Sequence, residues 1–565
     1  MRVAPIQLVA LLPALALIAA CGDDGATQQG DVADATTADP DTAGDVLDST
    51  SGDGAGDTTI ADVPRDTSPR DTTNPQAGAW QTTWSARVEG QGARVLGLRY
   101  LGGQSSSSAL LALEVGAGAA ALDSGDGDTT ELPGEGHRVV FVYLDPTSGN
   151  VIRSGAIELA ESETVGAVTK APNGFAVALA GETGRVALGQ VFGTVLRVAL
   201  VTIESEDHAR LGLPASADLL SPTTGGGATP LALRIEAVVA SALRVTVGED
   251  SATLDVPAMA GVGFLTLAAA TSGTPLPAEG HGLVTVDGLA PERVFETRSG
   301  AVLTVDVTKE TTIGSTTLAA GRSAIVIGAV QEEGPIVPLA LWQSAEGGAS
   351  ELDVMQVQSG GGGLVIAGVG EGRVEFGPDT LEATSPRDFI AALGSSAGII
   401  YTASECDRIK AVTSGFQYRI LKTTCDLDGQ PALALTLLTT DFGGNLQEPF
   451  DLPLATLASD GAVTLHSGLV SLNVTDDRAY GALVDLGDGP RLVLVRSDGQ
   501  PYDSGVLEAL VRDGDSDEPI HFQPLRQGGF GGGGGATTNA FLFAVTHDTG
   551  PVVGRARIDL KTLIW

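Results

Sequence analysis

The residues that could do chemistry are few and widely spaced. Six histidines lie at least 26 residues apart, at His137, His208, His281, His466, His521 and His547. None stands in an H-x-x-H or H-E-x-x-H setting, which would place two imidazoles on one helix face as zinc ligands. The spacing therefore predicts no zinc site. His137, His208 and His547 fall in or beside polar turns, where we expect solvated side chains.

Two glycine-containing motifs look like parts of enzyme sites. Gly394-Ser395-Ser396-Ala397-Gly398 matches G-x-S-x-G, but it lies in a turn between two β-type runs and not between a strand and a helix. Gly368-Val369-Gly370-Glu371-Gly372 resembles the start of a dinucleotide fingerprint, yet no helical pattern follows it. Both motifs are better explained as turn glycines, so they predict no catalytic residue.

Two acidic clusters contain the oxygen ligands that calcium prefers. One alternates Asp513, Asp515 and Asp517, and the other is formed by Asp123, Asp126 and Asp128. Both lack the glycine and the distal glutamate of an EF-hand loop. Solvated acidic loops are the favoured interpretation, calcium is the alternative, and no other cofactor is expected.

The N-terminus has the pattern of a secretory signal. Arg2 is its single positive charge, and the apolar run from Leu8 to Ala20 is shorter than the ~20 residues that a transmembrane helix needs. The run ends in Ile18-Ala19-Ala20-Cys21, which resembles the lipobox of bacterial lipoproteins. That resemblance implies a signal peptide at residues 1–20, cleavage before Cys21, and fatty acyl chains such as palmitate on the Cys21 thiol. The alternative is a buried cysteine in an N-terminal helix.

Residues 21–79 differ sharply in composition from the rest. Between Gly22 and Ala79 there are 13 Asp and two Arg, with no Glu, Lys or aromatic residue. Such a segment cannot bury enough apolar surface to offset its chain entropy, so we expect a disordered acidic tether. It resembles the Asp/Thr tracts that follow the lipobox in surface lipoproteins of Gram-negative bacteria. Gly22 after the anchor favours the outer membrane, on the cell surface or facing the periplasm.

Residues 80–565 read as a repeat of short β-type runs divided by polar turns. Eight copies of an apolar run leading into a turn recur at intervals of 44 to 68 residues, measured between Phe141, Leu196, Phe264, Ile325, Phe389, Leu433, Leu492 and Phe541. A period near 57 residues suits one four-stranded unit. In the fourth and fifth copies, Thr312-Ile313-Gly314 aligns with Glu375-Phe376-Gly377 and Thr317-Leu318 aligns with Thr380-Leu381.

The repeat resembles the bacterial β-propeller repeat of the SBBP type. The resemblance implies an all-β propeller of seven or eight four-stranded blades, because stacking such sheets around an axis buries both of their faces. We expect Trp80-Gln81-Thr82-Thr83-Trp84 to add a strand to the last blade and close the ring. A pair of β-sandwich domains is the alternative fold.

Cys406 and Cys425 flank one hairpin of the sixth copy. They lie at the start of its first strand and the end of its second, and these positions face one another in an antiparallel pair. A lipoprotein leaves the reducing cytoplasm, so we predict a disulfide contributing about 3 kcal/mol. A reactive thiol and half of a metal site are the alternatives.

The net charge and the lack of a recognisable catalytic motif determine which function we expect. The 565 residues include 32 Lys and Arg against 70 Asp and Glu, a net charge of −38, which excludes nucleic acid as a partner. We expect a lipid-anchored, non-enzymatic binding or scaffold protein whose partner is a protein or a polysaccharide. The long loops at 123–136, 211–229 and 511–538 are the candidate contact loops. Two alternatives stay open: a glycan hydrolase or lyase with axial carboxylates, and a periplasmic outer-membrane assembly factor.

Overall fold

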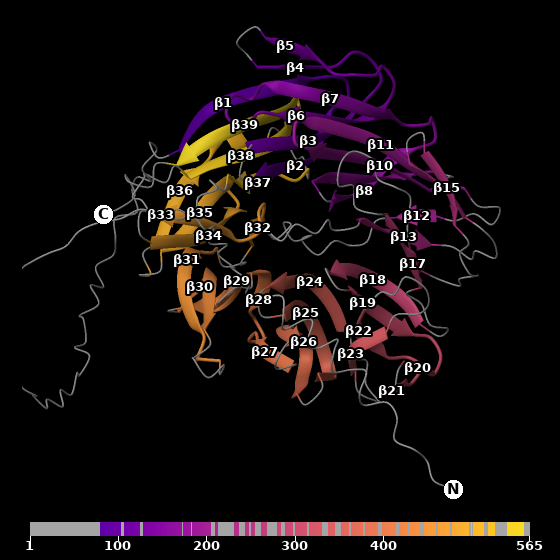
Figure 1. Ribbon diagram of the computed structural model, residues 1–565. Helices are drawn as coiled ribbons and strands as arrows, with labels where there is room; N and C mark the ends of the chain where they lie inside the picture. The colour runs from indigo at the N-terminus through magenta and orange to yellow at the C-terminus, as the bar shows by residue number, and fades with distance from the viewer. Residues whose placement is uncertain are drawn as a thin grey trace, which may run out of the picture. The chain divides into compact units, whose positions relative to one another are not determined.

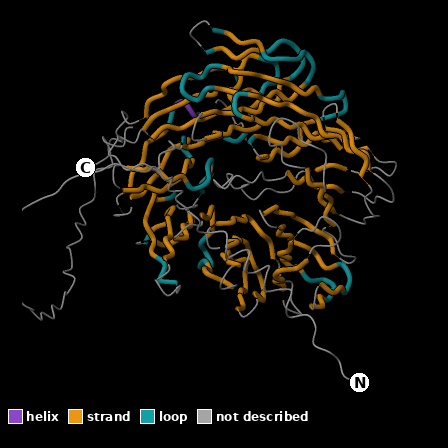
Figure 2. The backbone as a smooth tube through the Cα atoms, viewed as in Figure 1, coloured by secondary structure: helices purple, strands orange, loops and turns teal. Residues whose placement is uncertain are grey.

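The computed structural model describes residues 80–558 with gaps in the loops, of which the longest are 213–230, 268–279 and 526–538. The predicted signal peptide, Cys21 and tether lie outside the described residues. Gln76–Trp565 forms one compact unit. Among the described residues no helix has the length and apolar character needed to cross a membrane. Strands dominate, with a single helical turn, η1 (Glu508–Leu510) (Figure 2).

The described strands form eight antiparallel units of four, named here from first to fourth strand (Figure 1). Unit one is β2 (Arg94–Gly102), β3 (Ser107–Val115), β6 (Arg138–Leu144) and β7 (Val151–Glu158). Unit two is β8 (Thr164–Ala171), β9 (Gly174–Ala180), β10 (Gly184–Phe192) and β11 (Val195–Glu204). Unit three is β12 (Arg210–Gly212), β13 (Leu231–Glu236), β16 (Val262–Leu267) and β17 (Gly280–Leu283). Unit four is β18 (Leu289–Thr297), β19 (Gly300–Val307), β22 (Ser323–Ala329) and β23 (Val337–Ser344).

The second half of the chain repeats the same order. Unit five is β24 (Leu352–Gly360), β25 (Gly363–Phe376), β26 (Asp379–Leu393) and β27 (Gly398–Thr402). Unit six is β28 (Arg408–Thr413), β29 (Gln417–Leu427), β30 (Gln430–Thr439) and β31 (Phe450–Thr456). Unit seven is β33 (Val470–Val474), β34 (Asp477–Asp485), β35 (Pro490–Arg496) and β36 (Pro501–Val506), with β32 (Thr464–Leu465) also paired to β34. Unit eight is β37 (His521–Pro524), β38 (Asn539–His547), β39 (Gly550–Ile558) and β1 (Trp80–Glu89).

The fold is therefore an all-β propeller, and the described strands give it eight blades. The fourth strand of unit eight is β1, which comes from the N-terminal end of the body, as the sequence predicts. β1 pairs antiparallel with β39, from Trp80 opposite Ile558 to Arg87 opposite Val552. The first strand of unit one, β2, contacts β37 and β38 of unit eight. The last unit thus packs against the first.

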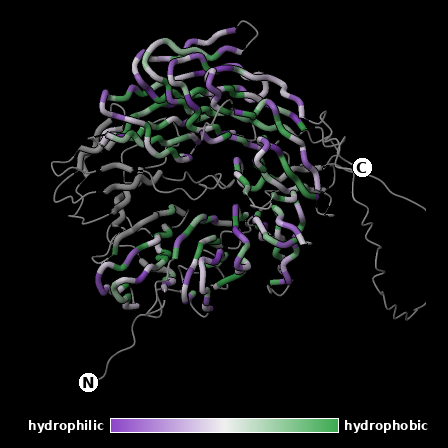
Figure 3. The backbone as a smooth tube through the Cα atoms, turned by 180° about the vertical axis from the view of Figure 1, so that it is seen from behind, coloured by the Kyte–Doolittle hydropathy of each residue, from purple (hydrophilic) through white to green (hydrophobic). Residues whose placement is uncertain are grey.

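Packing between neighbouring units explains the apolar composition of the middle strands. All seven residues of β6 are buried, because both faces of its sheet are covered. The Phe141 ring of unit one packs against Gly189 of unit two so closely that a Cβ at this glycine would lie 2.2 Å from the ring. In the same way, the Phe175 ring of unit two packs against Gly97 of unit one. These glycines leave room for a neighbour's aromatic ring. Hydrophobic residues follow the strands through the body (Figure 3).

Excursions between the second and third strands tie several units to the unit before them. β4 (Ala121–Asp123) and β5 (Thr129–Glu131) leave unit one, and β4 pairs with β1 of unit eight. β14 (Leu243–Val247) and β15 (Asp250–Leu254) leave unit three, and β14 pairs with β11 of unit two. The far end of β25 pairs in the same way with β23 of unit four. Each pairing adds strands to the fourth strand of the preceding unit.

The predicted alignment of the fourth and fifth copies is confirmed by this excursion. In unit four it is a separate hairpin, β20 (Thr311–Ile313) and β21 (Thr316–Leu318), with Thr312 opposite Thr317. In unit five Glu375 stands opposite Thr380 in the same way. Ile313, Leu318, Phe376 and Leu381 are all buried at the equivalent positions.

Two of the eight predicted copies are not equivalent to the other six, which lie on the third strands of their units. The run from Leu196 belongs to β11, the fourth strand of unit two. The next strand in the chain, β12, belongs to unit three and does not pair with β11 as a hairpin partner. The run from Phe541 belongs to β38, the second strand of unit eight. Apolar runs occur at the second, third and fourth strands of different units, so such a run does not identify the third strand.

Candidate functional site

Buried charged side chains of unit six lie together on the face of its sheet that packs against unit five. In β29, Ile420 packs with residues of unit five and Leu421 packs with residues of unit seven. Alternation along the strand then places Lys422 on the unit-five side. There its ammonium meets Tyr401, from β27 of unit five.

Lys422 is the centre of this cluster. Its Nζ donates to the Tyr401 hydroxyl at 3.0 Å, and it lies 3.2 Å from Oδ2 of Asp407 and 2.9 Å from Oδ2 of Asp451. The Lys422 and Asp407 side chains are 6% and 7% exposed, whereas Asp451 is 29% exposed. Thr436 donates its hydroxyl proton to the other Asp451 oxygen at 2.6 Å. The site therefore holds one ammonium and two carboxylates, and water reaches it at Asp451.

Two opposing effects set the ionisation of the cluster. Burial disfavours the Lys422 ammonium, but the hydrogen bonds and charges of Tyr401 and Asp451 outweigh it and raise the Lys422 pKa above its usual range. Burial also raises the pKa of the Tyr401 hydroxyl, against the lowering effect of Lys422. At neutral pH the resting state is a charged lysine beside a neutral tyrosine.

A second buried carboxylate joins the same two units. Asp388, on β26 of unit five, accepts a hydrogen bond from the backbone N–H of Ile409 on β28 at 2.5 Å. Burial raises the Asp388 pKa, and the hydrogen bond to Ile409 opposes that effect. The start of β28 is thereby fixed to unit five, close to Asp407.

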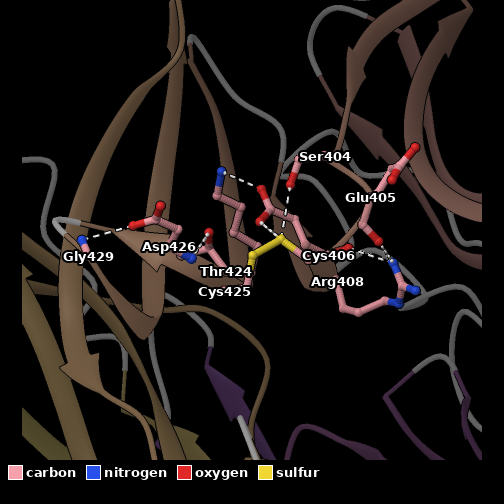
Figure 4. Close-up of a disulfide and its surroundings, with 10 residues drawn as sticks. Ser404, Glu405, Cys406, Arg408, Thr424, Cys425, Asp426 and Gly429 are labelled. Carbon is pink, nitrogen blue, oxygen red and sulfur yellow. Dashed lines mark hydrogen bonds and ion pairs between the residues drawn. A yellow bond between two sulfur atoms is a disulfide. The ribbon is translucent and has the colours of Figure 1, made fainter. Parts of the chain in front are cut away.

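The predicted disulfide closes the same end of the hairpin (Figure 4). Cys406 and Cys425 are bonded, and their Cα atoms are 5.8 Å apart. The pair continues the register in which Arg408 stands opposite Thr423, so the two cysteines face one another as expected. Asp407 and Thr424 are the next residues inward from the bond.

The calcium candidates are only partly described. Asp513, Asp515, Asp517 and Asp126 lie outside the described residues. Glu518, at the end of the first cluster, forms an ion pair with Arg94 at 3.1 Å. Asp123 and Asp128 flank the turn of the β4–β5 hairpin. In the described part of the chain, no group of three or more His, Cys, Asp or Glu is arranged to hold a metal ion.

His137, expected to be solvated beside a turn, is partly exposed and also contacts a carboxylate. His137 Nε2 lies 2.7 Å from Oε1 of Glu114, which also bonds Arg94. The turn before β6 returns the chain to the end of β3, which brings the imidazole to this carboxylate. His208 lies outside the described residues. The segment 394–397 of the G-x-S-x-G match also lies outside them, between the hairpin strands β26 and β27.

A glycan-cleaving site would need paired carboxylates near the axis. Asp353 on β24 is the single acidic residue of the first strands whose side chains the structure describes. These strands therefore form no axial carboxylate pair.

Lys422 and its partners lie within residues 401–451 but belong to two units, so their contact could not be predicted without knowing how the units pack. One signal was available. Lys422 is one of only five lysines in 565 residues, and it interrupts the apolar run Ile420-Leu421 in a strand. A lysine at such a position needs a buried partner.

Comparison with known proteins adds little beyond the fold. No family model and no curated protein matches the chain. Among solved structures, the WD40 domain of SCAP from fission yeast is similar at 8% identity and a TM-score of 0.26. That similarity covers 70% of this chain and 92% of the other. The blade count rests on the strand pairing described above.

Proposed function

We propose that this propeller is a lipid-anchored protein of the cell envelope that binds a partner without catalysing a reaction. The support begins with the lipobox-like Ile18-Ala19-Ala20-Cys21 and the acidic segment behind it. Acyl chains on Cys21 would anchor the protein, since two or more chains bind a bilayer stably where one is marginal. The tether would hold the body away from the headgroups and from the anionic membrane surface.

The observation that carries the proposal is the place of the closing strand. β1 begins at Trp80, directly after the segment read as a tether, and it is paired on both sides, with β39 and with β4. The Trp80 ring stacks on Phe522 and Phe541 with centroids 6.2 and 6.1 Å apart. A tether attached here would pull on a strand of unit eight that is paired along both of its edges. That arrangement suits a body displayed at the end of a linker.

The partner would meet the loops between strands. The β4–β5 hairpin offers one such surface, because Thr129, Thr130 and Glu131 are all exposed and β5 is the last strand of its sheet. A net charge of −38 disfavours polyanions, so a protein with a basic surface or a neutral polysaccharide fits best. A periplasmic assembly role would use the same exposed edge by strand addition.

Metabolic labelling tests the anchor. Cells that express the full chain are fed an alkyne-bearing palmitate analogue, and the purified protein is examined for label. We expect label on the wild-type chain and on Cys406→Ser, and none on Cys21→Ser. An unlabelled wild type, or label that persists in Cys21→Ser, contradicts the proposal.

A further inference from the structure

The Lys422 cluster has the composition and geometry of a site for amide formation between side chains. A primary amine lies within hydrogen-bond distance of two carboxyl groups, at 3.2 Å from Asp407 Oδ2 and 2.9 Å from Asp451 Oδ2. The amine and the Asp407 carboxyl are both shielded from solvent. Three strands and the start of a fourth fix the groups, so they cannot separate while the protein is folded.

We propose that Lys422 and Asp407 form an intramolecular isopeptide bond, with Asp451 carrying the proton. Nζ of Lys422 attacks Cγ of Asp407, a new N–C bond forms, and the C–O bond to one carboxyl oxygen breaks. The reactants are an ammonium and a carboxylate, and the products are a secondary amide and one water molecule. Atoms and charge balance without an oxidant, a nucleotide or a metal, and Asp451 ends as the carboxylate it was at the start.

The two carboxyl groups are suited to different roles. Asp407 is the acceptor because its carboxyl is buried beside Nζ, where solvent water does not compete with the amine. Asp451 is partly exposed and its second oxygen is held by Thr436, so it can take a proton from Nζ and deliver it to the departing oxygen. Tyr401 adds a hydroxyl at 3.0 Å that keeps the amine in place.

Proximity lowers the barrier to this step. Well-oriented groups within one molecule react with effective molarities of about 10⁵–10⁸ M, which a free amine and a free acid in water cannot match. The expelled water leaves through the exposed side of Asp451. The raised Lys422 pKa makes the reactive neutral amine scarce, so we expect the bond to form slowly after folding.

The bond would act beside the disulfide and independently of it. Cys406–Cys425 already joins the start of β28 to the end of β29, but both cysteines are exposed to solvent. A buried amide between neighbouring residues of the same hairpin would hold the strands together after reduction of the disulfide. This inference does not depend on the lipid anchor.

Peptide mapping of the wild-type chain tests it directly. The protein is reduced, alkylated and digested with trypsin, which ordinarily cuts after Arg387, Arg408, Arg419 and Lys422. The isopeptide bond predicts that peptide 388–408 stays joined to peptide 420–478, with Lys422 uncut and the mass of one water missing. A free 388–408 peptide together with cleavage after Lys422 overturns the proposal. Loss of water confined to 420–478, with 388–408 free, would mean a bond to Asp451 and also overturns it.

Variants identify the acceptor and the proton carrier. Asp407→Ala should restore cleavage after Lys422. Asp407→Asn should keep the crosslink but release ammonia in place of water, because an amide is also an acceptor for the amine. Asp451→Asn should remove the crosslink while leaving the Cys406–Cys425 disulfide, which reports on folding of the hairpin. An Asp451→Asn chain that still crosslinks as fast as wild type overturns the role given to Asp451.

Discussion

The titration of His521 offers a quantitative test of how the last unit meets the first. His521 opens β37, and its ring hydrogen-bonds the Val95 backbone on β2 of unit one. Burial lowers the His521 pKa from 6.5 to about 4, an effect that the bond to Val95 opposes and the nearby Lys170 reinforces. The folded protein therefore keeps this imidazole neutral at pH values where an unfolded chain protonates it.

The sign and size of the effect follow from linkage. Because the folded pKa is depressed, the stabilisation is present above pH 6.5 and is lost as the pH falls through 6.5 toward 4. The full effect is about 3 kcal/mol, and between pH 7 and pH 5 it amounts to about 2 kcal/mol. Stopping at pH 5 keeps most carboxylates ionised, and the titration of the other histidines cancels when wild type is compared with a variant at His521 alone.

The assay compares wild type with His521→Asn, whose amide cannot titrate. Free energies of unfolding are measured by urea denaturation at several pH values from 7 to 5. We expect the advantage of wild type over the variant to shrink by about 2 kcal/mol across this range. An advantage that stays constant with pH would refute the burial of a neutral His521 between units eight and one.

Three further predictions concern the other elements that hold the body together. Lys422→Met should lower the free energy of unfolding by at least about 3 kcal/mol, because it leaves two carboxylates unpaired, one of them buried. The control Lys410→Met, at an exposed position of β28, should change the free energy of unfolding by no more than about 0.5 kcal/mol. Equal effects of the two variants in calorimetry would contradict a stabilising role of the Lys422 ion pairs. In an Asp407→Ala background, where no amide to Lys422 can form, Cys406→Ser should cost about 3 kcal/mol under non-reducing conditions, and a reductant should lower the midpoint of the Asp407→Ala chain to match; an unchanged midpoint would exclude a stabilising disulfide. Trp80→Ala should lower the free energy of unfolding, measured by urea denaturation, by about 3 kcal/mol, because it removes the ring that stacks on Phe522 and Phe541. A decrease of less than about 1 kcal/mol would argue against β1 as the closing strand.

Much of the fold could be predicted because it repeats. Each unit needs apolar strands and polar turns, so even divergent copies show eight recurrences. The excursion could be aligned because Thr312-Ile313-Gly314 matches Glu375-Phe376-Gly377 and Thr317-Leu318 matches Thr380-Leu381. The disulfide could be predicted because strand register is a local property that places Cys406 opposite Cys425. The closing role of Trp80 followed from its being the first strand-like segment of the body.

The errors and omissions have a physical origin as well. β38 has two covered faces, and β11 is an equally apolar run although it is only partly buried, so neither sequence reveals which strand of a unit it forms. The Lys422 cluster depends on how units five and six pack, since Tyr401 comes from one and Asp451 from the other. Sequence spacing holds no information on contacts between such distant strands.

Protease shaving of intact cells tests the central claim, an anchored propeller presented at the end of an acidic tether. A protease is added to whole cells, and released peptides are identified by mass spectrometry for cleavage within residues 22–79. The proposal predicts cleavage in this segment without lysis, and release of an intact body that begins near Trp80. A chain that is found free in the medium before protease is added would contradict the anchor. A chain that is protected until the outer membrane is opened would contradict surface display and place the binding role in the periplasm.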